Sequence, residues 1–261
     1  MLSIPRKELA DPDRTALADA ASAGSGHWAE FYLLPVMDSF QMSSKLIQTL
    51  MQQASGMLRP LAPAETEAAL AGLGADCLAP LYQAFNGGYF FDRALEVFPI
   101  GTSHYTEIRQ WNDAAGWRKD FDEDLNGIVF FAHDLFCFQY GVLAGAVVRL
   151  NYETGEVESL APDLQAFLEL FLGDCDYYSG FSLLEDWEEE NGPLPMGQRL
   201  FAKKPFVLGG DWEVCNLWAS APLPVLSFRA FIAKHIKGKP DGTKVSINLP
   251  DGKKLKGVIQ R

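Results

Sequence analysis

The sequence feature that most constrains the fold is an Asn-Gly-Gly triplet formed by Asn86, Gly87 and Gly88. Residues 78–85 before it repeat apolar side chains at helical spacing, and three aromatic residues follow it at 89–91. Glycine adopts left-handed backbone conformations at no steric cost, so the triplet is expected to close this helix. The chain then turns directly into a strand. Such an abrupt change of periodicity predicts a domain that mixes helices and sheet.

Another helix is expected just before this one. Pro63 suits a first helical turn, and the apolar residues that follow stop at Gly72 and Gly74. Asp76 is then expected to cap the second helix. An earlier helix is expected to begin near Pro35 or Met37.

The stretch after the triplet has the patterns of an antiparallel sheet. A helix is expected at residues 104–115, ended by a glycine, and a further helix opened by Pro162 and Asp163 should cover one face of the sheet. A hairpin turn at residues 153–156 makes the last strands a meander. The expected strands are residues 95–98, 128–131, 136–140, 146–152 and 157–160.

Three segments resemble motifs of the SUKH superfamily, which includes fungal regulators of cell-wall synthesis and bacterial immunity proteins that neutralise polymorphic toxins. They are Ala64-Glu65-Thr66-Glu67, Cys77-Leu78-Ala79-Pro80 and Asn86-Gly87-Gly88, with the family's usual Leu-Pro pair separated here by one alanine. Residues 126–172 are similar to its hairpin-rich sheet and closing helix. The resemblance implies a SUKH-like α+β fold, an antiparallel sheet flanked by helices, and no catalytic signature.

This resemblance divides the chain into three parts. Residues 1–26 are expected to form a flexible N-terminal arm, and residues 27–190 the SUKH-like α+β domain. Residues 191–261 are expected to be a C-terminal αβ extension packed on the same domain. Within the extension we expect a helix near residues 223–236 and a hairpin of two strands, residues 244–248 and 255–259.

The balance of charge limits the classes of partner. The chain has 34 acidic and 22 basic residues, a net charge of −12, which argues against a general binder of nucleic acids or anionic membranes. Basic residues gather at the C-terminal end, where the last hairpin is interpreted as an edge hairpin protected by lysines or as a contact to the acidic body. Because the sequence has no apolar signal region and no membrane-length stretch, we expect a cytoplasmic protein.

The sequence holds little that points to catalysis. Its four cysteines are widely spaced and interpreted as free core thiols, and no metal-ligand or phosphate-loop pattern occurs, so no metal and no cofactor is expected. His133 beside Asp134 is the one pair that suits general-base chemistry. Neighbouring residues on an extended chain point to opposite faces, so a histidine in a turn is the preferred interpretation. The chain is therefore expected not to be an enzyme.

Residues 173–190 are the candidate partner-binding segment. They hold seven carboxylates, no basic residue and interleaved aromatic side chains, a composition that suits a basic partner. An ordinary helix with a solvated acidic face is an equal alternative. The candidate binding residues are Asp174, Asp176, Tyr177, Tyr178, Glu185, Asp186, Trp187, Glu188 and Glu189.

These observations lead to one hypothesis of function and two alternatives. The hypothesis is a non-catalytic immunity protein that binds and neutralises a cognate secreted or polymorphic bacterial toxin, for example a basic nuclease domain, in the cytosol. The first alternative is an intracellular scaffold or regulatory binding protein, as in the fungal branch of the superfamily. The second is a small-molecule enzyme.

Overall fold

The computed structural model describes residues 39–101, 106–121, 125–249 and 252–260. The arm expected at residues 1–26 and the expected start of the first helix near Pro35 lie outside this range. Within it, none of the helices is long and apolar enough to cross a lipid bilayer.

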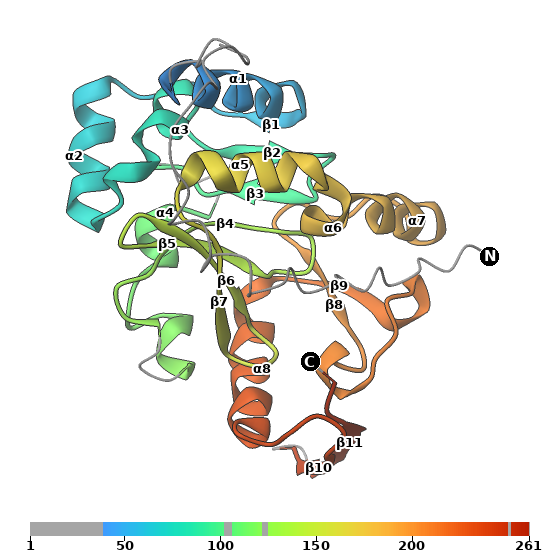
Figure 1. Ribbon diagram of the computed structural model, residues 1–261. Coiled ribbons are helices and arrows are strands. Elements are labelled where there is room, and N and C mark those ends of the chain that lie inside the picture. Colours follow the sequence, from blue (N-terminus) through green and yellow to red (C-terminus); the bar gives the residue numbers. More distant parts are fainter. Residues whose placement is uncertain (1–38, 102–105, 122–124, 250–251, 261) are drawn as a thin grey trace, which may run out of the picture. The chain divides into compact units, whose positions relative to one another are not determined.

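The architecture is α+β, built on one seven-stranded antiparallel sheet (Figure 1). Each strand pairs with the next along the chain, so the sheet is a continuous meander. The strands are β1 (Ala54–Met57), β2 (Gly88–Phe90), β3 (Leu95–Val97), β4 (Val129–His133), β5 (Gln139–Leu143), β6 (Ala146–Asn151) and β7 (Glu156–Ala161).

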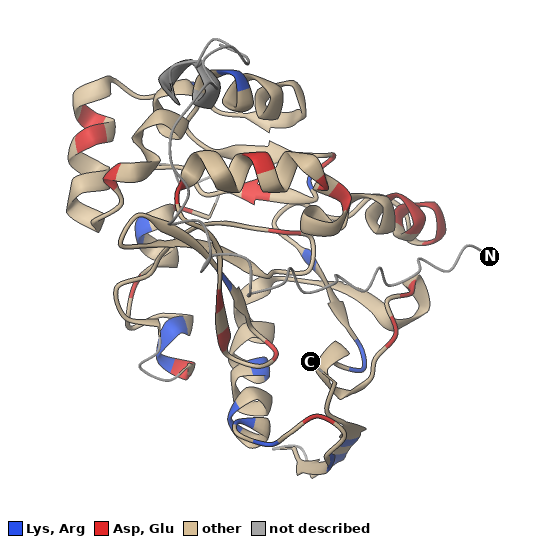
Figure 2. Ribbon diagram, viewed as in Figure 1, with Lys and Arg blue, Asp and Glu red and all other residues tan. Residues whose placement is uncertain are grey.

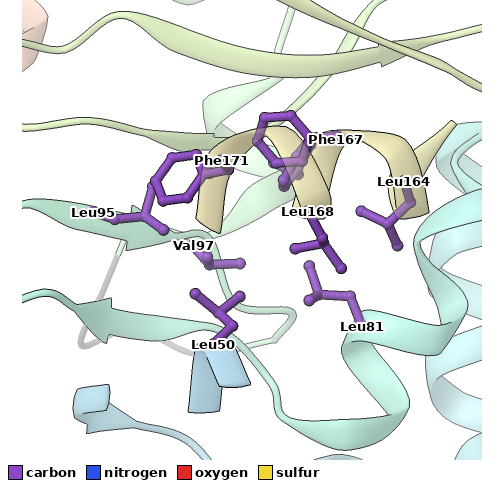
Figure 3. A pocket seen from close by; sticks show the side chains of 10 residues that line it. Leu50, Leu81, Leu95, Val97, Leu164, Phe167, Leu168 and Phe171 are labelled. Carbon is purple, nitrogen blue, oxygen red and sulfur yellow. The ribbon is translucent and has the colours of Figure 1, made fainter. Parts of the chain in front are cut away.

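Helices α1 (Ser39–Gln52), α3 (Ala79–Ala84) and α5 (Leu164–Gly173) meet over one face of the sheet. Figure 3 shows their apolar side chains converging on the strand β3. The space left among them is only about 10 Å³, so this junction is packed core and holds no ligand site. Asp163 caps α5 as expected, accepting the N–H of Ala166 at 2.8 Å.

Of the two helices predicted before the triplet, one agrees with the structure and the other begins differently. The first, α2 (Pro63–Leu73), agrees with its expected limits, and Gly74 closes it in a left-handed conformation. The second begins as a 3₁₀ turn, η1 (Asp76–Leu78), and Asp76 does not cap it. Because Phe85 after α3 is already extended, Gly87 and Gly88 place their left-handed backbone at the entry to β2 and not at the helix end.

The prediction of a helix at residues 104–115 is wrong. Only a single helical turn forms there, α4 (Ile108–Trp111). Asn112 ends it by binding the backbone of Phe130 in the sheet through both side-chain atoms, at 2.7 and 2.8 Å. A side-chain amide that pairs with a strand in this way competes with continued helix formation. A 3₁₀ turn, η2 (Trp117–Asp120), follows.

The strand expected at residues 136–140 lies three residues later in the chain, at Gln139–Leu143. The Oδ1 atom of Asp134 accepts the N–H groups of Phe136 and Phe138 at 3.0 and 2.8 Å, which bends this segment into a turn. Cys137 within it has a φ of +68°, a value uncommon outside glycine. The strand β5 therefore begins only at Gln139.

The C-terminal extension shares the main core through Phe201 and Leu226. Its last hairpin forms a separate two-stranded sheet. Residues 206–208 and 214–216 are 3₁₀ turns. The elements are β8 (Arg199–Ala202), η4 (Phe206–Leu208), η5 (Val214–Asn216), β9 (Leu217–Ser220), α8 (Pro222–Ile236), β10 (Lys244–Asn248) and β11 (Lys254–Val258).

Candidate functional site

The acidic segment forms two short helices, α6 (Cys175–Ser179) and α7 (Phe181–Asn191), joined at Gly180. Gly180 has a φ of +76°, and a Cβ atom there would lie 2.4 Å from the ring of Phe136. The junction is therefore fixed tightly against the sheet. Two of the candidate carboxylates order these helices, because Asp174 accepts the N–H of Tyr177 at 3.3 Å and Asp176 that of Ser182 at 2.8 Å.

Three other candidates have structural contacts. Trp187 is only 7% exposed, so its ring is not available to a partner. Tyr178 is half-buried and stacks on Phe171. The carboxylate of Glu188 binds the guanidinium of Arg93 at 2.5 Å and accepts the N–H of Leu194 at 2.7 Å.

The remaining candidates form an open acidic surface on α7. Glu185, Asp186 and Glu189 are exposed, as is Glu190, and none of the four has a partner among the residues that the structure describes. Tyr177 on α6 is 65% exposed. In Figure 2, acidic positions mark much of α7, with no basic position on that helix. The predicted segment thus divides into helix-ordering residues and a smaller exposed set.

The structure also contains a buried charged cluster made of Glu96, His133 and Arg199, from strands β3, β4 and β8. The Oε2 atom of Glu96 accepts from Nη2 of Arg199 at 2.6 Å and lies 2.9 Å from Nε2 of His133. The Nε of Arg199 lies 2.9 Å from the same imidazole nitrogen. All three side chains are essentially inaccessible to solvent, which corrects the interpretation of His133 as a turn residue.

The charges in this cluster follow from burial and from Arg199. Burial lowers the pKa of His133, and the positive charge of Arg199 adds to this effect, giving about 4. Burial raises the pKa of Glu96, but Arg199 and His133 together outweigh it and hold the pKa at about 2. At neutral pH the cluster is therefore an ionised carboxylate and a guanidinium with a neutral imidazole.

The imidazole also faces a thiol. The Nδ1 atom of His133 lies 3.6 Å from Sγ of Cys137, so a thiol, an imidazole and the carboxylate of Glu96 stand in the order of a nucleophile, base and orienting acid. Cys137 has no exposed surface, and burial raises the pKa of its thiol well above the ordinary value. No substrate reaches the sulfur in this arrangement. The cluster therefore acts as a structural link between the sheet and the extension.

The prediction that all four cysteines are core thiols is wrong for Cys215, which is exposed. Cys137 is buried, and the other two cysteines are half-buried. All four are free. Within the described ranges, no group of three or more His, Cys, Asp or Glu side chains is placed to hold a metal ion.

A second buried pair, Glu153 and Arg229, links the turn between β6 and β7 to α8. Their side chains approach to 3.8 Å, Glu153 accepts the N–H of Val207 at 2.8 Å, and Arg229 donates to the carbonyl of Ala202. Two buried ionic contacts thus connect the extension to the sheet.

The neutral state of His133 predicts a pH dependence of stability. The unfolded chain takes up a proton near pH 6.5, whereas folded His133 does so only near pH 4. The contribution of this group is fully present above pH 6.5 and is lost as pH falls to 4, by at most roughly 3 kcal/mol. Replacing His133 with Gln should remove this dependence from the free energy of unfolding, measured by urea titration at pH 7, 5.5 and 4.5.

The variant and the natural protein must be compared at each pH, because Asp134 contributes in the opposite direction. Burial raises the pKa of Asp134 to about 8, so its contribution is lost as pH rises from 3.8 to 8. The difference between the two proteins isolates the imidazole. If the difference in the free energy of unfolding between the two proteins stays constant from pH 7 to 4.5, His133 is not held neutral.

No family model matches the sequence, and no curated protein matches it. The crystal structure of Atu4351 from Agrobacterium tumefaciens is similar, with 11% sequence identity and a TM-score of 0.49. The match covers 80% of this chain and 96% of that one. A likeness at this level is too low to transfer a family or a function.

Proposed function

We propose that this chain is a non-catalytic immunity protein with a SUKH-like scaffold, which binds a basic toxin domain in the cytosol and covers its active site. The motif resemblance around the Asn-Gly-Gly triplet supports the scaffold. The observation that carries the choice of binding surface is the set of exposed carboxylates on α7, Glu185, Asp186, Glu189 and Glu190, which have no partner among the described residues.

Such a surface suits a toxin that acts on nucleic acid, because a nuclease presents cationic groups where its substrate phosphates bind. Carboxylates fixed on a helix attract those groups over a distance of about 10 Å at moderate salt. This attraction raises the rate of association more than it slows dissociation. Tyr177, which is exposed beside the helix, adds apolar contact area.

The test is co-expression of this chain with each toxin domain encoded beside its gene. The expected result is restored growth with one toxin domain, and a stable complex of the two purified proteins. Growth that stays arrested with every such domain would overturn the proposal.

Charge reversal on α7 should slow complex formation. With Glu185, Asp186 and Glu189 all changed to Lys, we expect the association rate constant for the neutralised toxin to fall at least about 10-fold at low salt. The dissociation rate constant should change much less. Glu188 is left intact because it stabilises the fold through Arg93. Stopped-flow mixing at several salt concentrations measures both constants.

A matched control reverses three exposed carboxylates elsewhere. Glu65 and Glu67 on α2, together with Asp76, give the same change in net charge when replaced by Lys. An equal slowing by both triple variants would mean that overall charge, and not the α7 surface, governs association.

A further inference from the structure

A loop between β8 and β9 carries an exposed tryptophan that the fold holds in place. The ring of Trp212 stacks on that of Phe206, with centroids 3.6 Å apart and planes within 4°. Its edge meets Phe136 at 5.1 Å. One face of the indole is thus covered by protein, yet the residue remains 52% exposed. A large aromatic side chain fixed in this way is ready to contact a partner.

The loop itself is closed by one side chain. The amide of Asn216 accepts the N–H of Lys204 at 2.9 Å and donates to the carbonyls of Lys204 and Asp211 at 3.1 and 2.9 Å. A Cβ atom on Gly210 would lie 2.0 Å from the carbonyl oxygen of Lys204, so the chain crosses itself closely here. Because the loop is ordered before any partner arrives, binding costs less conformational entropy.

Two carboxylates lie directly beside Trp212. Asp211 and Glu213 flank it in the sequence and are exposed. Lys203 and Lys204 of the same loop are also exposed, and their ammonium groups donate to the loop carbonyls of Cys215 and Gly209 at 2.8 and 2.9 Å.

The acidic helix lies next to this loop. The turn η5, which ends the loop, contacts α7. The exposed carboxylates of α7 therefore add to the negative potential around Trp212. Tyr177 is linked to the same region, since Arg149 lies over the rings of both Tyr177 and Phe138, and Phe138 stacks 6.4 Å from Trp212.

We propose that Trp212, with Asp211 and Glu213, binds an arginine side chain of a partner protein. A guanidinium packs on the exposed part of an indole and is attracted to its π-electrons, and carboxylates accept its N–H groups. The same carboxylates repel phosphate groups, which disfavours nucleic acid as the ligand. The inference rests on the proposed function for the identity of the partner, and it extends the binding surface from α7 to a loop of the C-terminal extension.

The experiment uses the full chain and an octa-arginine peptide as the probe. In NMR spectra, the indole N–H signal of Trp212 should shift on addition of the peptide, and Trp212→Ala should weaken peptide binding at least about 10-fold. Trp218→Ala is the matched control, because Trp218 on β9 is 41% exposed and packs against Phe201. It should change the dissociation constant less than 2-fold. The double variant Asp211→Asn, Glu213→Gln should weaken binding while leaving the aromatic stack intact.

Several results would overturn the inference. In the first, the indole N–H signal of Trp212 stays in place while other indole signals shift. In the second, both tryptophan variants weaken peptide binding equally. In the third, a single-stranded oligonucleotide shifts the Trp212 signal and the peptide does not. If Trp212→Ala fails to fold, the Asp211 and Glu213 variant decides in its place.

An assay of toxin neutralisation distinguishes a failure of this inference from a failure of the proposed function. If Trp212→Ala protects against the cognate toxin as well as the natural chain does, the loop is not part of the interface, while the immunity role stands. If the peptide binds at Trp212 and no toxin is neutralised, the arginine site stands and the immunity role fails.

Discussion

Replacing Arg199 with Met is expected to lower the free energy of unfolding by about 3–5 kcal/mol, because it leaves the buried carboxylate of Glu96 without its cation. In the natural protein, Glu96 accepts from Arg199 at 2.6 Å, and both side chains are about 2% exposed. Urea denaturation at pH 7 measures the loss. Without Arg199, burial should raise the pKa of Glu96 above its ordinary value, so the variant should recover stability as the pH falls through this raised value towards 4.5.

Two further variants separate charge from packing. Adding Glu96→Gln to Arg199→Met removes the uncompensated charge, so the double variant should regain much of the loss. Arg93→Met removes a comparable ion pair, with Glu188, whose side chains are 23% and 27% exposed, and should cost about 1 kcal/mol or less. If the single and double variants at residue 199 are equally unstable, the aliphatic packing of arginine, and not its charge, holds the extension to the sheet.

The parts of the fold that were predicted correctly depend on local signals. The helix α2 has proline at its start and a glycine after its end, and α8 begins with Pro222. The hairpin of β6 and β7 was predicted from alternation and a glycine-containing turn. In each case the residues that decide the element lie within it or beside it. The α+β class with an antiparallel sheet is therefore confirmed.

The wrong predictions depend on contacts that sequence spacing does not reveal. Asn112 ends its helix by reaching a strand 18 residues away. The buried cluster was missed because Glu96 and Arg199 are 103 residues apart and neither belongs to a motif. Exposure was misjudged for a similar reason, since Trp187 packs inward while Trp212, which was not among the candidates, faces solvent. Only the packing of α7 and of the loop decides which tryptophan a partner can contact.

The Asn-Gly-Gly triplet gives the other large effect, because Gly87→Ala should lower the free energy of unfolding by about 3 kcal/mol or more. Gly87 has a φ of +72°, and a Cβ atom there would lie 2.6 Å from the carbonyl oxygen of Val97 and 2.7 Å from the nitrogen of Pro99. The chain cannot move away easily. Gly87 accepts the N–H of Leu58 at 3.0 Å, and both amide atoms of Asn86 bind the backbone of Ile100 at 2.9 Å.

Gly74 is a control with almost the same backbone conformation. Its φ is +71°, but a Cβ atom there would have no neighbour within 4 Å. Gly74→Ala therefore measures the cost of a left-handed alanine alone, about 1 kcal/mol. The excess loss at Gly87, measured by urea denaturation of both variants, is the cost of the close approach to β3. Equal losses would mean that the backbone yields at Gly87, and that the triplet needs glycine for its conformation and not for the space.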